Sequence, residues 1–226
     1  MNKTAPKTVE DRLMRSLISF LLLGLTALPA MAKKPAAAAG KIPTVLVLGD
    51  SLSAGYGLKR TQAYPALLSE KAEAAGQRVH IINAGVSGDT TAGGLRRLPR
   101  LLDRPIDVFI VELGINDIFR GVPVAQIAAN LQKIIDRARA HSPQVRVIVA
   151  GMQLPQTSVD DSLTAFGQLY AEIARRNSAE LVPFLLDGVA GNPNLNQPDM
   201  IHPNASGQKV LATNVWPVLE RALRKG

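Results

Sequence analysis

The chain has 226 residues, of which 46% are hydrophobic, and it contains no cysteine. This length suits one domain with a single sizeable core and is too short for two comfortable ones. The lack of cysteine excludes disulfides, a thiol nucleophile and thiolate metal sites. The formal net charge is +8, but the basic residues are spread along the chain without interleaved aromatic residues. Since no nucleic-acid-binding motif is present either, we expect a solvated basic surface and no nucleic-acid partner.

Residues 1–32 have the pattern of a secretory signal peptide. Basic residues precede an apolar run over 17–28, and small residues that a signal peptidase requires end at Ala32. The run is shorter than the roughly 20 residues that span a bilayer. We therefore expect cleavage before Lys33, a periplasmic or secreted protein, and no stable membrane insertion. Two alternatives are an uncleaved signal anchor and a translation start at Met14.

The rest of the chain predicts a flexible lead-in over 33–41, where proline, glycine and an alanine run leave little hydrophobic pattern, and a domain over 42–226. Five apolar runs predict strands, at 44–48, 78–82, 107–112, 145–150 and 181–183. Helical patterns lie between and after them, at 64–75, 93–102, 124–140, 159–176 and 205–223. Apolar strands separated by helices favour a parallel sheet covered on both faces. We therefore predict an α/β fold, a three-layer α/β/α sandwich with about five parallel strands.

Chemically useful residues follow three successive strands. Ser51 comes after the first predicted strand, Gly88 after the second and Asn116 after the third. In parallel α/β sheets, ligands bind beyond the carboxyl ends of the strands. We therefore expect the three loops to meet over one site.

Ser51 needs a base to become a nucleophile, and His202 is the best candidate among the three histidines. His80 lies in a strand pattern and His141 at the end of a basic helix, where structural roles suffice. Asp199 precedes His202 by three residues, and on one helical turn this spacing puts both side chains on the same side. Asp199 could then orient the ring while the other ring nitrogen faces Ser51.

A tetrahedral intermediate also needs hydrogen-bond donors where negative charge develops. The backbone N–H groups of Ser51 and Gly88 and the side-chain amide of Asn116 are candidates, because glycine permits close backbone approach and an amide donates without adding charge. Asp50 and Asp117 lie beside these residues, and we interpret them as loop anchors. No nucleotide-binding glycine pattern occurs, and Asp199 with His202 is the only close pair of metal-ligand type. We expect no cofactor and no metal.

Four blocks carry a resemblance to a known family, in this order: Gly49-Asp50-Ser51-Leu52-Ser53, Ser87-Gly88-Asp89-Thr90, Gly114-Ile115-Asn116-Asp117 and Asp199-Met200-Ile201-His202-Pro203. The chain resembles the SGNH (GDSL) hydrolases, and within them the bacterial thioesterase I, lysophospholipase and arylesterase group. The resemblance implies a flavodoxin-like strand order, catalysis by Ser51, Asp199 and His202, and an oxyanion hole formed by Ser51, Gly88 and Asn116. It also implies a serine hydrolase that cleaves carboxylic esters and thioesters without a cofactor.

The resemblance further places Ile118 and Phe119 beside an acyl groove, although either side chain could instead pack into the core. Ile115 replaces a glycine of thioesterase I and could narrow the site or point into the core. We expect a monomer that acts on a small-molecule or lipid ester. The alternatives are a carbohydrate or peptidoglycan O-acetylesterase, and a non-catalytic envelope binding module.

Overall fold

Five parallel strands form one sheet in the order β2-β1-β3-β4-β5. Their bounds are Thr44–Gly49 (β1), His80–Gly85 (β2), Val108–Glu112 (β3), Arg146–Ala150 (β4) and Glu180–Val182 (β5). This order is flavodoxin-like, with the change of direction along the sheet between β1 and β3. The predicted parallel α/β architecture is confirmed.

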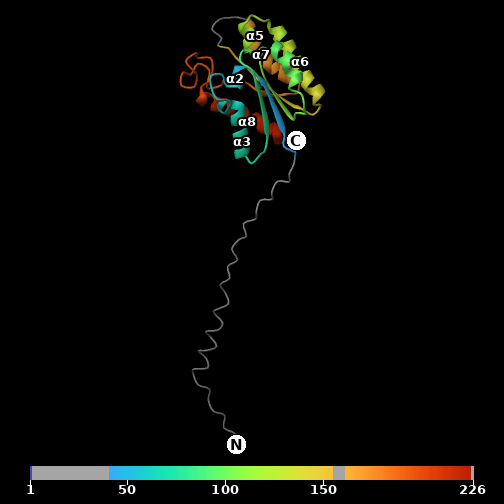
Figure 1. Ribbon diagram of the computed structural model, residues 1–226, viewed down its shortest axis with the longest axis vertical. Helices are drawn as coiled ribbons and strands as arrows, with labels where there is room; N and C mark the ends of the chain where they lie inside the picture. Colours follow the sequence, from blue (N-terminus) through green and yellow to red (C-terminus); the bar gives the residue numbers. More distant parts are fainter. Residues whose placement is uncertain (2–40, 155–160, 225–226) are drawn as a thin grey trace. The chain divides into compact units, whose positions relative to one another are not determined.

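The computed structural model describes residue 1, residues 41–154 and residues 161–224 (Figure 1). Except for Met1 and Lys41, the predicted signal peptide and the predicted lead-in lie outside this part. Among the described residues, no helix is both long enough and apolar enough to cross a membrane.

Helices cover both faces of the sheet. On one face α3 (Tyr64–Ala74) packs against α8 (Ala205–Arg224); on the other, α6 (Val124–His141) contacts both α4 (Thr91–Arg97) and α7 (Asp161–Arg176). In Figure 1, α3 and α8 lie to the left of the strands and α6 to the right. The three predicted layers are therefore present.

The central strands are buried because their side chains are apolar on both faces. Residues Val45 to Leu48 of β1 are fully buried, as are Val108, Phe109 and Ile110 of β3. The apolar face of α6 repeats at helical spacing and presents Ile127, Leu131 and Ile134 to this core. These layers give the strand ends a rigid base.

Two sequence expectations about element bounds are wrong in detail. The second strand runs over His80–Gly85 instead of 78–82, because its ladder with β1 continues to the pair Gly49 and Gly85. His80, expected inside the strand, is its exposed first residue. The helix predicted at 93–102 begins at Thr91 behind the capping residue Thr90, and its last turn is the 3₁₀ helix η2 (Leu98–Arg100).

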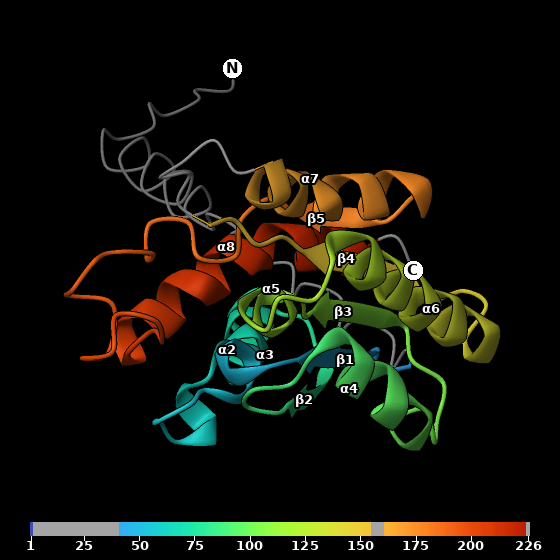
Figure 2. The same cartoon turned by 90° about the horizontal axis from the view of Figure 1, so that it is seen from above.

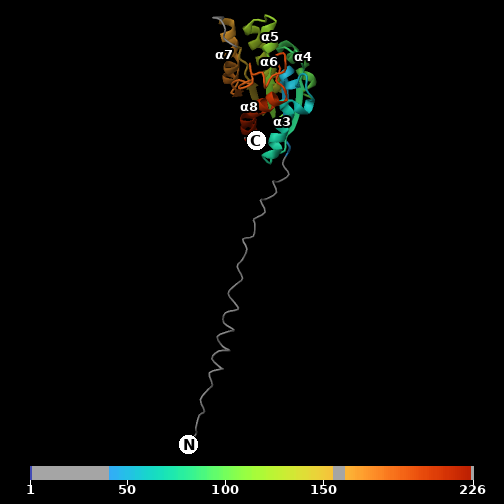
Figure 3. The same cartoon turned by 90° about the vertical axis from the view of Figure 1, so that its left-hand side faces the viewer.

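Three short elements have no predicted counterpart. They are α2 (Ser51–Ala54), η1 (Arg60–Gln62) and α5 (Ile115–Phe119). Such short pieces lack the repeating pattern that identifies longer helices. Seen from above in Figure 2, α2 and α5 lie close to each other, and Figure 3 shows α5 at the upper end of the sheet.

Candidate active site

Ser51 is positioned by the abrupt end of β1. The strand stops at Gly49, Asp50 caps the short helix α2 by accepting a 3.0 Å hydrogen bond from the backbone N–H of Leu52, and Ser51 is the first helical residue. Asp50 is fully buried, whereas Ser51 is half-buried. A buried cap therefore fixes the backbone on which the serine hydroxyl is presented.

Asp199 and His202 lie together, but not on a helical turn as the spacing suggested. Oδ1 of Asp199 accepts hydrogen bonds from the backbone N–H groups of Ile201 and His202, both at 3.0 Å, so the carboxylate closes a turn ahead of α8. Met200 has a φ of 59°, in the left-handed region that a methionine seldom adopts. The separate cap residue Asn204 starts α8.

The structure brings Ser51, His202 and Asp199 into one line of contacts. The distance from His202 Nε2 to Ser51 Oγ is 3.1 Å, and that from His202 Nδ1 to Asp199 Oδ2 is 2.7 Å. Hydrogen bonds from the His202 backbone and ring and from the Ile201 backbone lower the pKa of Asp199 to about 2. Asp199 is therefore a carboxylate at neutral pH and can hold a proton on Nδ1, which leaves Nε2 facing the serine. The ring of Tyr56 lies 4.4 Å from the imidazole, centroid to centroid.

The three candidate donors also gather at this end of the sheet. Ser51 and Gly88 lie just after β1 and β2, and within the described part of the chain their backbone N–H groups have no hydrogen-bond acceptor. Gly88 has a φ of 75°, which a glycine adopts without steric cost. Both N–H groups can therefore serve a ligand.

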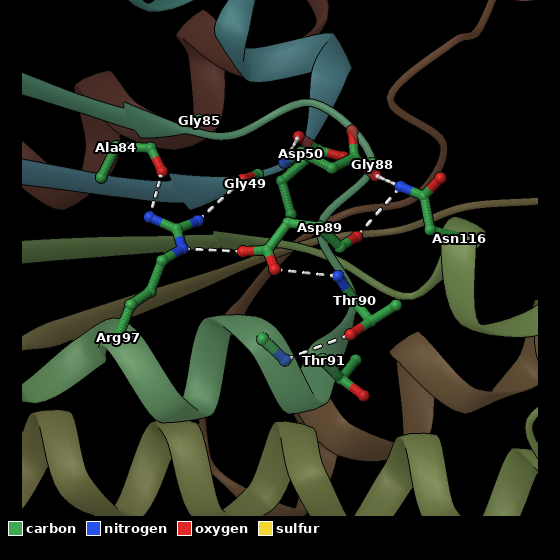
Figure 4. A network of polar contacts seen from close by, with 12 residues as sticks. Gly49, Asp50, Ala84, Gly85, Gly88, Asp89, Thr90, Thr91, Arg97 and Asn116 are labelled. Carbon is green, nitrogen blue, oxygen red and sulfur yellow. Dashed lines mark hydrogen bonds and ion pairs between the residues drawn. The ribbon is translucent and has the colours of Figure 1, made fainter.

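Asn116 bridges the loops that carry the other two donors. Its Nδ2 donates to Oδ2 of Asp50 and to the carbonyl oxygen of Asp89, each at 3.0 Å (Figure 4). Asp50 immediately precedes Ser51, and Asp89 immediately follows Gly88. One amide group thus sets the spacing between the two loops.

Arg97 braces the Gly88 loop, a role that the sequence did not predict. Its guanidinium donates to Asp89 Oδ2 at 2.7 Å, to the carbonyl oxygen of Ala84 at 2.6 Å and to that of Gly49 at 3.0 Å (Figure 4). The planar group with several donors suits three acceptors at once. Arg97 therefore joins the ends of β1 and β2 to the loop between β2 and α4.

A second unpredicted feature is a pair of acidic groups directly behind the site. Asp50 and Glu112 are both fully buried, and the backbone N–H of Asp50 donates to Oε2 of Glu112 at 3.2 Å. Burial raises the pKa of Asp50 to about 6. Burial and the nearby Asp50 raise the pKa of Glu112 well above its usual value. Glu112 lies in the block Val111-Glu112-Leu113-Gly114, but nothing in that pattern indicated a partner 62 residues away.

The other residues singled out in the sequence are distributed as follows. The buried Asp117 accepts bonds from the backbone and hydroxyl of Thr91, so it ties α5 to the start of α4. Ile115 and Ile118 are partly buried and pack against the core. Phe119 is 61% exposed. Of the two alternatives for these residues, packing into the core therefore applies to Ile118. Phe119 instead points outward.

Comparison with known proteins agrees with this geometry. The family described as "GDSL-like Lipase/Acylhydrolase family" matches residues 47–210. The chain belongs to this family. It is 41% identical over 207 residues to the esterase TesA of Pseudomonas aeruginosa, an alignment that covers 91% of this chain and 99% of the relative. Thioesterase 1/protease 1/lysophospholipase L1 of Escherichia coli K12 is 36% identical over 170 residues, with 75% and 79% covered.

A crystal structure of TesA superposes with a TM-score of 0.75 at 40% identity, covering 79% of this chain and 99% of that one. The SGNH resemblance and the fold are thereby confirmed. The chain is a serine hydrolase of this family that acts on esters.

Proposed function

We propose that this esterase cleaves acyl esters, and also thioesters, through an acyl-enzyme intermediate formed on Ser51. The supporting observation is the line of contacts from Ser51 through His202 to Asp199, at 3.1 and 2.7 Å. Nε2 of His202 takes the hydroxyl proton as Oγ of Ser51 attacks the acyl carbonyl carbon. The resulting imidazolium is stabilised by Asp199. It then protonates the leaving alcohol or thiol, and a water molecule repeats the sequence to release the acid.

The negative oxygen of the tetrahedral intermediate is bound by the backbone N–H groups of Ser51 and Gly88 and by the Asn116 amide. Before substrate binds, both hydrogens of Nδ2 are engaged, one by Asp50 and one by the carbonyl oxygen of Asp89. An oxyanion is a stronger acceptor than a neutral carbonyl. It therefore competes with Asp89 for the second hydrogen, while Asp50 retains the first.

The substrate carries an apolar acyl chain. Exposed apolar side chains occur on all the loops that bring the candidate residues together: Tyr56, Val86, Phe119, Met200 and Ile201 are each 45–61% exposed. Large apolar groups exposed near one site are typical of surfaces that contact lipid or other apolar ligands. We infer that Phe119, with Ile118 supporting it from the core, contacts the chain, and that lysophospholipids and other fatty esters are the substrates.

Hydrolysis of p-nitrophenyl esters from acetyl to palmitoyl tests this proposal, with Ser51→Ala as the control. We expect activity that depends on Ser51 and favours medium or long chains. A strict acetyl preference would support the O-acetylesterase alternative instead. Activity that survives Ser51→Ala, or wild-type protein without activity, would contradict the assignment, and the second result would favour a binding module.

The role of Phe119 has its own test. Phe119→Ala removes an exposed side chain, so the fold should persist while the preferred chain length shifts. The partly buried Ile118 provides a matched comparison, since Ile118→Val changes packing without changing the outward surface. An unchanged profile in Phe119→Ala would exclude contact with the acyl chain.

We also propose that the protein is exported and acts as a monomer in the periplasm or outside the cell. The charge and apolar pattern of residues 1–32 supports export. Mass spectrometry of the periplasmic and secreted fractions should find a chain beginning at Lys33. Retention of Met1 or Met14 would contradict cleavage.

A further inference from the structure

Glu112 occupies an unusual place for an acidic residue. It ends the central strand β3, opposite Gly49 of β1 in the ladder, and its side chain is fully buried. Oε2 accepts hydrogen bonds from the Ser53 hydroxyl at 2.6 Å and from the backbone N–H of Asp50 at 3.2 Å. A carboxyl group is thus enclosed by the same short segment that carries Ser51.

Gly49 makes room for this carboxyl group. A Cβ at position 49 would collide with the Ser53 side chain and with Oε2 of Glu112. Ser53 is held in turn by the Tyr64 hydroxyl at 2.9 Å. The missing side chain at position 49 therefore leaves the space that the Glu112 carboxyl group and the Ser53 hydroxyl occupy.

Within the described residues, no lysine or arginine forms an ion pair with either member of the acidic pair. In the part of the chain that the structure describes, neither carboxyl group accepts from a basic side chain, and the nearby Arg97 is used by Asp89 and two carbonyl oxygens. The titratable groups that act on the pair are Tyr64 of α3, Tyr170 of α7, Asp89 and His202. Two adjacent buried anions without a cation would be very costly.

The hydrogen bonds of the pair show where one proton can lie. Asp50 accepts from the Leu52 backbone at Oδ1 and from the Asn116 amide at Oδ2, and both donors favour its charged form. Oε1 of Glu112 accepts from no donor among the described residues. Of the two groups, Asp50 has both oxygens stabilised by donors and Glu112 has one oxygen without a donor, so a single proton is better placed on Glu112.

We propose that Glu112 is a neutral carboxylic acid whose hydroxyl donates a hydrogen bond to Asp50, and that Asp50, kept as the carboxylate, positions the Asn116 amide as the oxyanion donor. Glu112 and Asp50 are then positioning residues, neither of which touches the substrate. The inference rests on the proposed function for the role of Asn116. It goes further by assigning a protonation state and a purpose to two residues behind the site.

The arrangement accounts for how Asn116 can serve two acceptors. The anionic Asp50 holds one amide hydrogen strongly, so the amide plane is fixed when the second hydrogen moves from Asp89 to the oxyanion. A neutral Asp50 would hold the amide less strongly and would leave its orientation to the weaker contact with Asp89. A small displacement of a catalytic donor lowers the rate of the chemical step much more than it weakens substrate binding.

Infrared difference spectroscopy tests the protonation state without any need for activity. The wild type at pH 8 should show the C=O stretch of a protonated carboxyl group, and Glu112→Gln should lack it. Glu73→Gln, which changes an exposed carboxylate on α3, serves as the matched control and should retain the band. If no band is lost in Glu112→Gln, Glu112 is ionised and the proposal is wrong, whatever the enzyme hydrolyses.

Kinetics with p-nitrophenyl butyrate test the positioning role. Asp50→Asn should lower kcat by about 10- to 100-fold and leave KM nearly unchanged, because only a transition-state donor is misplaced. Glu112→Met removes the proton donor at similar volume and should lower kcat by about tenfold, whereas Glu112→Gln keeps a donor and should restore most of the rate. Wild-type kcat in both Asp50→Asn and Glu112→Met, or equal losses in Glu112→Met and Glu112→Gln, would overturn the role. Loss of the Ser51 dependence would instead contradict the proposed function.

Discussion

Replacing Glu112 with glutamine should make the stability of the protein less sensitive to pH. In the folded state, burial and the neighbouring Asp50 raise the pKa of Glu112 well above its usual value, whereas in an unfolded chain a glutamate titrates near ~4.3. Between these two pKa values the folded protein binds a proton that the unfolded chain has released. The free energy of unfolding therefore falls as the pH rises, and the stability contributed by the neutral acid is lost as the pH rises toward the folded pKa.

The size of the effect follows from the number of protons. One proton changes the free energy of unfolding by about 1.4 kcal/mol per pH unit. Between the unfolded and the folded pKa of Glu112, the wild type should thus lose stability at this slope relative to Glu112→Gln, and the difference should level off at the folded pKa. Asp50, whose pKa is raised to about 6, is present in both proteins, so its contribution largely cancels in the difference.

Urea unfolding at pH 5, 6, 7 and 8 measures this difference. The single tryptophan, Trp216, packs against the core from α8 and provides the fluorescence signal. Glu73→Gln controls for the loss of one carboxylate at the surface. A difference between wild type and Glu112→Gln that stays constant over these pH values would refute the reasoning, because Glu112 would then bind protons equally in both states.

Three further results are expected. Asn116→Ala should lower kcat by about 10²- to 10³-fold with little change in KM, as expected for the loss of one oxyanion donor, and an increase in KM alone would contradict that role. Asp199→Asn should lower kcat by about 10³- to 10⁴-fold, since an amide no longer holds the required ring tautomer; near-normal turnover would remove Asp199 from the site. Gly49→Ala should destabilise the fold by about 1–3 kcal/mol, measured by thermal unfolding, because its Cβ would collide with Ser53 and Glu112.

The sequence predicted structure correctly where an apolar pattern extended over a whole strand, and it predicted contacts between residues that are close in the chain. Apolar runs predicted each strand, since a strand buried on both faces needs an apolar side chain at nearly every position. The proximity of Asp199 and His202 was predicted from their spacing, but the reason was wrong. The carboxylate is held by backbone N–H groups of a turn, not by a helix.

Contacts between distant segments could not be predicted from the sequence. Arg97 meets the carbonyl oxygens of Ala84 and Gly49 only because the sheet places the ends of β1 and β2 side by side. Glu112 reaches Asp50 because β3 is the neighbour of β1. Such partners depend on strand order and register, which local composition does not determine.

In the proposed mechanism, the groups that Asn116 links perform the reaction, and other side chains select the substrate. The amide links the residue before Ser51 to the residue after Gly88, so these groups form one interlocked frame. Phe119, on the same helix as Asn116, and Ile201, directly before His202, are 61% and 57% exposed. Mutant libraries restricted to these two outward side chains can therefore search for new acyl preferences while the frame stays unaltered, and this division offers a practical starting point for redesign.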